Sequence, residues 1–118
     1  MITIDLFRNA ENAEHYPAGQ TIFSAGDTGF VMYAVVEGEV ELLVSGKRVE
    51  IVGAGGVLGE MALLDTEIRS ATAIAKTDCR LAPVDRKRFQ FLVQQTPNFA
   101  LQLMRIMADR LRRMDGLL

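Results

Sequence analysis

The sequence of 118 residues has very few of the side chains that most often carry out covalent or metal chemistry. It contains one cysteine, Cys79, one histidine, His15, and no tryptophan. A single cysteine cannot form a disulfide within the chain, and one residue of each kind cannot supply the ligands of a structural zinc site. An enzyme with a histidine-based mechanism is disfavoured on the same inventory. We therefore expect no catalytic residue, no metal and no cofactor, and we interpret Cys79 as a core residue.

Long hydrophobic runs are also missing. No apolar segment approaches the roughly 18 residues that a membrane-spanning helix needs, and Asp5 and Arg8 interrupt the N-terminus before a signal-peptide core could form. With 49% hydrophobic and 24% charged residues, the composition is that of a globular protein, and the length fits one domain. The expectation is a single domain over residues 1–118, located in the cytoplasm and without membrane contact.

The residues that are present are unevenly distributed. Residues 1–59 carry three Lys or Arg and eight Asp or Glu, whereas residues 60–118 carry ten and seven. Nine of the ten glycines lie between Gly19 and Gly59. A glycine-rich acidic half followed by a glycine-poor basic half is typical of strands and turns followed by helices.

Short β-prone runs occupy most of the chain from about residue 15 to residue 84. Val40, Leu42 and Val44 alternate along residues 39–44, which is the pattern of a strand buried on one face. Ser45-Gly46 offers a tight turn into the next run. The other runs are residues 20–23, 33–36, 47–52, 70–75 and 78–84. Strands this short and this closely spaced predict an antiparallel β-roll, a jelly-roll-like barrel preceded by a short N-terminal segment.

The end of the chain changes to helical spacing. Asp85 is a good N-cap for a helix over residues 85–95, in which Phe89, Leu92 and Val93 share one face. Pro97 begins a second helix over residues 97–115. An apolar stripe runs along this second helix: Leu101, Met104, Met107 or Ala108, Leu111 and Met114. Because the helix ends the chain, the stripe must cover either the roll or a partner helix.

Residues 57–73 carry the clearest chemical signal. Within them, Gly59-Glu60-Met61-Ala62-Leu63 is followed by Arg69, ten positions after Gly59. A glycine before a helical turn directs backbone N–H groups at an anion, and a guanidinium suits the geometry of phosphate. A carboxylate such as Glu60 would suit a neighbouring ribose hydroxyl. These residues predict a binding site for a nucleotide monophosphate.

Two nearby glycine motifs do not match known phosphate-binding patterns and are interpreted as turns. Gly53-Ala54-Gly55 lacks the third glycine of a dinucleotide-binding fingerprint, because position 58 is Leu58. Gly46-Lys47 lacks the remainder of a Walker loop.

The segment resembles the phosphate-binding cassette of the cyclic nucleotide-binding domain family, whose pattern is Gly-Glu-x-Ala-Leu and, after a short gap, Arg-x-Ala-Thr. Residues 59–63 and 69–72 match this pattern position for position. Further matches precede it at residues 17–23, 26–27, 32–33 and 36–40. The resemblance covers nearly the whole chain. It implies a β-roll with a cassette helix and C-terminal B and C helices that binds cAMP or cGMP without chemical turnover.

The resemblance also assigns roles to individual residues. It places Glu60 on the ribose 2′-hydroxyl and Arg69 on the cyclic phosphate, where Ser70 adds a hydroxyl or amide bond. Gly59, Met61 and Ala62 complete the cradle around phosphate and ribose. The C helix covers the base in this family, which makes Leu111, Arg112 and Met114 lid candidates.

The chain departs from the family at two positions that bear on the base. Catabolite activator relatives read adenine with polar Thr or Ser residues near the end of the C helix, where this chain has Arg113-Met114-Asp115. Members selective for cGMP often carry threonine after the cassette arginine, where this chain has Ser70. We therefore expect cAMP as the ligand, with cGMP as the second candidate.

Ordinary structural roles would explain some of the same residues. Arg69 and a nearby Glu would also fit an exposed salt bridge worth about 0–1 kcal/mol. Ser70 and Thr72 fit plain strand positions, and the stripe of the last helix fits core packing. The run Arg86-Lys87-Arg88 fits a solvated helix face better than a nucleic-acid patch.

Three functions remain open from the sequence. The first is a non-enzymatic cyclic nucleotide receptor whose C-terminal helix moves or dimerises when the base is covered. The second is a nucleotide-free interaction or dimerisation module. The third is a fragment of a larger cAMP-regulated transcription factor or channel, and because the chain ends at Leu118 without a helix-turn-helix we expect no direct DNA binding. The expected partners are a cyclic nucleotide, an unknown effector protein and a second copy of the chain.

Overall fold

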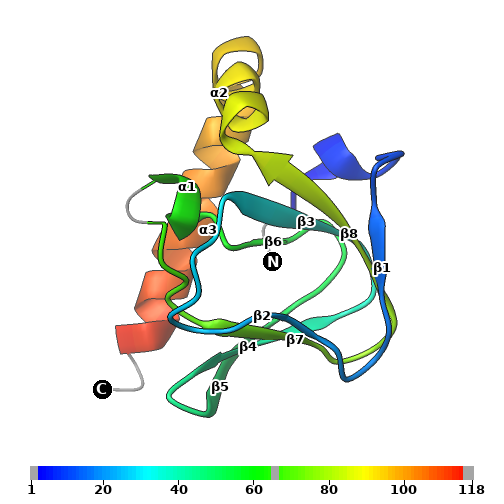
Figure 1. Ribbon diagram of the computed structural model, residues 1–118. Coiled ribbons are helices and arrows are strands. Elements are labelled where there is room, and N and C mark those ends of the chain that lie inside the picture. The colour runs from blue at the N-terminus through cyan, green and yellow to red at the C-terminus, as the bar shows by residue number, and fades with distance from the viewer. Residues whose placement is uncertain (1–2, 65–66, 116–118) are drawn as a thin grey trace.

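The computed structural model describes residues 3–64 and 67–115, with side chains as far as residue 113. Its strands and helices are ordered along the chain as Figure 1 shows. The strands are β1 (Glu14–Tyr16), β2 (Thr21–Phe23), β3 (Val31–Glu37), β4 (Val40–Val44), β5 (Lys47–Val52), β6 (Val57–Leu58), β7 (Thr72–Ala75) and β8 (Cys79–Asp85). The helices are a 3₁₀ turn η1 (Asp5–Phe7), α1 (Met61–Leu64), α2 (Arg86–Gln95) and α3 (Pro97–Asp115).

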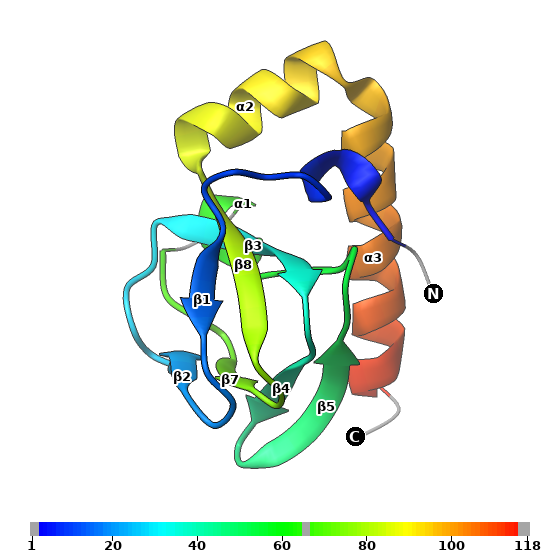
Figure 2. The same cartoon turned by 90° about the vertical axis from the view of Figure 1, so that its right-hand side faces the viewer.

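The strands form two antiparallel sheets of four strands each, in the orders β1-β8-β3-β6 and β2-β7-β4-β5. This arrangement confirms the predicted β-roll. The expected barrel does not close, because each sheet ends in edge strands that no described strand bridges to the other sheet. Figure 2 shows β1 lying beside β8 and α3 running along the roll past β5.

The hairpin of β4 and β5 forms as the sequence predicts. Ser45 and Gly46 both have positive φ, 52° and 76°, and they connect the paired residues Val44 and Lys47. A two-residue turn of this hand matches the right-handed twist of the strands that it joins. The hairpin therefore has a fixed register, and the inner side chains of β4 keep a defined direction.

The hydrophobic core has two parts. One part lies between the two sheets and contains Val40, Leu58, Leu81 and the fully buried Cys79. The other lies between the first sheet and the helices, where the rings of Phe7 and Phe89 meet that of Phe99 edge-on, with centroids 6.1 and 5.9 Å away. The N-terminal segment is thus part of the core through Phe7, which the sequence analysis did not foresee.

Helix α2 starts where its N-cap predicts. The Asp85 carboxylate accepts a hydrogen bond from the backbone N–H of Arg88 at 2.8 Å, which satisfies one of the free donors of the first turn. Phe89 and Leu92 are buried, but Val93 is partly exposed and does not belong to the buried face.

Helix α3 packs on the roll through a different face from the predicted stripe. Phe99, Leu103 and Ile106 are buried, whereas Leu101, Met104 and Leu111 are 49%, 56% and 61% exposed. Of the predicted stripe, Met107 is partly buried and packs against the core, whereas these exposed residues do not cover it. Contact of the exposed residues with a partner helix stays a prediction. No helix within the described ranges is long and apolar enough to cross a membrane.

Arg86, the first residue of α2, binds the end of α1. Its guanidinium donates to the carbonyls of Leu63 and Ala62 at 2.8 and 3.3 Å. Cationic donors are favourable at the C-terminal end of a helical turn, where carbonyls lack partners. Arg86, Lys87 and Arg88 are exposed, as a solvated helix face predicts, but the Arg86 side chain also attaches α2 to α1.

Candidate functional site

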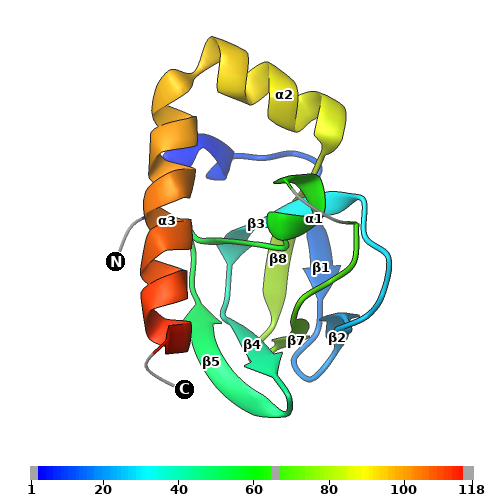
Figure 3. The ribbon, with the colours of Figure 1, turned by 90° about the vertical axis from the view of Figure 1, so that its left-hand side faces the viewer.

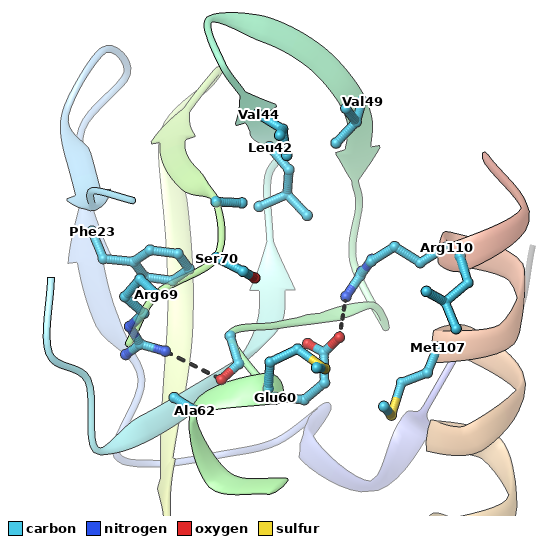
Figure 4. Close-up of a pocket in the computed structure, with 14 residues that line it drawn as sticks. Phe23, Leu42, Val44, Val49, Glu60, Ala62, Arg69, Ser70, Met107 and Arg110 are labelled. Carbon is cyan, nitrogen blue, oxygen red and sulfur yellow. Dashed lines mark hydrogen bonds and ion pairs between the residues drawn. The ribbon is translucent and has the colours of Figure 1, made fainter. Parts of the chain in front are cut away.

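A cavity of about 260 Å³ opens between α1, the β4–β5 hairpin and α3. Figure 3 shows α3 passing both α1 and the hairpin, and Figure 4 shows the side chains that line the space. The lining residues are Phe23, Leu42, Val44, Val49, Gly59, Glu60, Met61, Ala62, Arg69, Ser70, Ala71, Met107, Arg110 and Leu111.

Arg69 lies at one end of the cavity and is only 6% exposed. Its guanidinium donates to the carbonyl of Gly59 at 3.1 Å, and no Asp or Glu within the described ranges forms an ion pair with it. Burial lowers the pKa of Arg69 below its ordinary value, although it remains a cation at neutral pH. Asp27 and Glu60 partly offset this effect of burial, but no described carboxylate lies within ion-pair distance of the guanidinium. Arg69 is thus a buried cation and not part of an exposed salt bridge.

Two aromatic rings accompany this guanidinium. The central carbon of Arg69 lies 4.2 Å from the centre of the Phe23 ring and 5.9 Å from that of Tyr33. The Phe23 and Tyr33 rings are themselves stacked, with centroids 6.2 Å apart and an interplanar angle of 22°. Both rings are close enough for a cation–π interaction with the charge.

Glu60 is the second buried charge of the cavity, at 3% exposed. Its Oε1 accepts a hydrogen bond from Arg110 at 2.7 Å. Its Oε2 is buried and has no hydrogen-bond partner among the described residues. An unsatisfied carboxylate oxygen in such a place costs about 1–3 kcal/mol or more, so the site is arranged for a further donor.

Arg110 attaches α3 to this carboxylate. Besides Glu60, its guanidinium binds both oxygens of Glu50, at 2.6 and 3.3 Å, and the carbonyl of Val57 at 2.8 Å. Burial alone would lower the pKa of Arg110, but the two carboxylates raise it above its ordinary value. Arg110 is not among the site residues predicted from the sequence, although it continues the spacing of the buried Phe99, Leu103 and Ile106.

The structure brings most of the predicted site residues to one place. Gly59, Glu60, Met61, Ala62, Arg69, Ser70 and Leu111 all line the cavity. Arg112 does not line it, and its side chain is 73% exposed and faces Asp109 at 3.7 Å. The side chain of Met114 lies outside the described residues.

The remaining walls are apolar. Leu42 and Val44 from β4 and Val49 from β5 face Met107 of α3 across the space in Figure 4. Alternation along β4 is the signal that could have identified Leu42 and Val44. Val49 lies where the register between β4 and β5 shifts, so alternation alone does not place it on the same face. The cavity therefore has a polar end with Arg69 and Glu60, and an aliphatic end that suits a flat apolar group.

The cavity of this β-roll thus combines a buried cation, a buried carboxylate and an aliphatic wall. Comparison with known proteins identifies the class more narrowly. The cyclic nucleotide-binding domain family matches residues 13–96, and the chain belongs to this family.

Individual relatives agree with this membership. The chain is 35% identical over 117 residues to the "Cyclic AMP receptor protein" of Thermus thermophilus, covering 95% of this chain and 54% of the relative. It is 38% identical over 87 residues to the "cAMP-dependent protein kinase regulatory subunit" of Aspergillus niger, covering 72% of this chain and 21% of the relative. The chain thus spans about half the length of the first relative and a fifth of the second.

The fold is similar to that of a solved structure as well. The crystal structure of the Thermus thermophilus catabolite activator protein superimposes with a TM-score of 0.74 at 35% identity, over 88% of this chain and 52% of the other.

Proposed function

We propose that this chain is a non-enzymatic receptor domain that binds a cyclic nucleotide, with cAMP preferred over cGMP. The observation that carries the proposal is the pair of unmatched charges in one cavity. Among the described residues, the buried Arg69 has no ion-paired carboxylate, and the buried Glu60 Oε2 has no hydrogen-bond donor. A cyclic phosphate supplies the missing anion, and the ribose 2′-hydroxyl supplies the missing donor.

The apolar end of the cavity supports the same ligand. A purine placed there would contact Val44, Val49 and Met107, whose side chains offer van der Waals contact and exclude water. Leu111 extends this surface from the last helix, which favours α3 as the element that covers the base. The names of the two relatives point to cAMP, and Ser70 after Arg69 departs from the threonine of cGMP-selective members.

Arg110 provides a physical route from the ligand to α3. It occupies Oε1 of Glu60 and leaves Oε2 for the ribose, so the same carboxylate contacts α3 and the ligand. A ligand that changes the position or charge balance of Glu60 therefore acts on α3 directly. We expect the position of α3 to depend on whether the nucleotide is bound.

Titration calorimetry with cAMP and cGMP tests the proposal. We expect micromolar or tighter binding of cAMP, about −8 kcal/mol, and weaker binding of cGMP. Arg69→Ala should lose several kcal/mol of binding and keep the fold. Arg80→Ala, which removes an exposed arginine paired with Glu37, is the matched control and should bind as the wild type does. An absence of heat with either nucleotide would favour the interaction module instead.

A second candidate function is self-association through α3. Its exposed apolar side chains, Leu101, Met104 and Leu111 with Ala108, follow one line along the helix. A second copy of α3 would bury this line in a two-helix contact. Leu111 also lines the cavity and so belongs to both proposals. Leu101, Met104 and Ala108 do not line it, so substitutions at these three residues test self-association separately.

A further inference from the structure

We propose that Phe23 and Gly29 are positioning residues that hold the Arg69 guanidinium ready for the phosphate. The inference rests on the proposed function, since it explains how the phosphate end of that site is built. It assigns a role to two residues outside the cassette motif.

An aromatic ring stabilises the buried charge of Arg69. Arg69 has no carboxylate partner among the described residues, and its guanidinium instead faces the Phe23 ring at 4.2 Å. Tyr33 backs that ring at 6.2 Å, and Tyr16 meets Tyr33 edge-on at 6.3 Å. The stack keeps Phe23 in place, and Figure 4 shows its ring directly beside the guanidinium.

The aromatic contact differs from a salt bridge in one useful way. A carboxylate on Arg69 would have to be displaced by the incoming phosphate, which costs affinity. The Phe23 ring stabilises the cation through its face and carries no net charge, so the positive charge and the N–H donors not bound to the Gly59 carbonyl stay available. The site is therefore preorganised for an anion without a competing one.

The missing side chain of Gly29 provides space for the guanidinium. A Cβ atom on Gly29 would lie 2.1 Å from Nε of Arg69 and 2.3 Å from its central carbon. Gly29 does not have a positive φ, so only the space that it leaves requires glycine here. The loop is fixed in this position, because the N–H of Gly29 binds the Glu67 carbonyl at 2.6 Å and the N–H of Arg69 binds that of Asp27 at 2.7 Å. The guanidinium thus lies between an aromatic face and a side-chain-free backbone.

Substitutions of Phe23 test the aromatic role, with cAMP and 2′-deoxy-cAMP as probes in calorimetry. Phe23→Leu keeps apolar contact but removes the ring, and we expect about tenfold weaker cAMP binding. Phe23→Tyr should restore affinity to within about threefold. The ratio of the affinity for cAMP to that for 2′-deoxy-cAMP measures the contribution of the 2′-hydroxyl, which Glu60 is proposed to bind. This ratio should not change. Equal binding by Phe23→Leu, failure of Phe23→Tyr to restore it, or a changed ratio would overturn the inference.

Gly29→Ala tests the role of space. The added methyl group must push the guanidinium away from Phe23, so we expect at least about tenfold weaker cAMP binding with little change in melting temperature. Gly53→Ala is the matched control, because Gly53 also lacks a positive φ and a Cβ there meets no atom within 4 Å. Gly29→Ala that binds as tightly as Gly53→Ala would show that the position of the guanidinium does not depend on this space.

A ligand-free measurement separates this inference from the proposed function. In ¹⁵N-labelled protein, the Nε–H signal of Arg69 should be shifted by the ring current of Phe23 and should move toward an ordinary arginine position in Phe23→Leu. An unmoved signal refutes the positioning role even if cAMP binds. A signal that moves as expected in a wild-type protein that binds no nucleotide would instead refute the proposed function alone.

Discussion

Replacing Arg110 by methionine should destabilise the whole domain, because one guanidinium serves two buried carboxylates. The side chains of Arg110, Glu50 and Glu60 are 13%, 13% and 4% exposed, so water cannot take over the lost bonds. Methionine keeps much of the aliphatic length but leaves the buried Glu60 carboxylate without a cation. Glu50 then keeps only its longer ion pair with Arg113, at 3.7 Å. Removing one partner of a buried ion pair costs about 3–5 kcal/mol.

Urea denaturation followed by circular dichroism measures this loss. For a urea dependence of about 1.5 kcal/mol per molar, a loss of ~4 kcal/mol lowers the midpoint by roughly 2.5 M. The native state should still be populated in buffer, because a domain of this kind has a free energy of unfolding of about 5–15 kcal/mol. Arg112→Met is the control on the same helix, since its exposed pair with Asp109 is worth about 0–1 kcal/mol.

The two carboxylates provide the decisive comparison. When Glu50→Gln and Glu60→Gln are added to Arg110→Met, the unpaired charges disappear, and at least half of the lost stability should return. A loss below about 1 kcal/mol in Arg110→Met would show that the ion pairs are not worth what their burial implies. A triple variant no more stable than Arg110→Met would show that unpaired charge is not the cause.

Three further outcomes are expected. Met104→Glu places a charge in the exposed stripe of α3, so if the stripe joins two copies of the chain, the variant should sediment as a monomer. The same sedimentation coefficient for the variant and the wild type would exclude that contact. Asp85→Ala removes the N-cap of α2 and should cost about 1 kcal/mol in thermal unfolding, while Asp85→Asn should cost much less. Burial raises the pKa of the Cys79 thiol above the ordinary 9.0, so the folded chain keeps a proton that the unfolded chain loses, and the free energy of unfolding should fall above about pH 9 by up to about 1.4 kcal/mol per pH unit. Cys79→Ala should lack this contribution to the slope of stability against pH, and an identical slope in both proteins would contradict the assignment.

Local signals account for what the sequence could predict. The cassette residues from Gly59 to Leu63 are contiguous, so their order alone predicts a turn that faces one ligand. The Ser45-Gly46 turn and the Asp85 cap are likewise determined by a few neighbouring residues. Such features depend little on what lies opposite them in the fold.

The missed residues depend on contacts between distant segments. Both faces of α3 have helical apolar spacing, and the choice of Phe99, Leu103 and Ile106 as the buried one is made by the core that Phe7 and Phe89 provide. Arg110 can continue that buried face because Glu50 of β5 and Glu60, which precedes α1, neutralise its charge. Phe23 likewise reaches Arg69 through the pairing of β2 with β7, which no local pattern in residues 20–23 reveals.

The bond from Arg86 to α1 has a thermodynamic consequence. Arg86, the first residue of α2, donates hydrogen bonds to the end of α1. A shift of α1 toward a ligand would therefore lengthen these hydrogen bonds or move α2 with it. Ligand binding and the position of α2 are then linked by a coupling free energy, which acts equally in both directions. Phe91 is 57% exposed on α2. If a protein that binds there changes the affinity for the nucleotide by some factor, the nucleotide changes the affinity for that protein by the same factor.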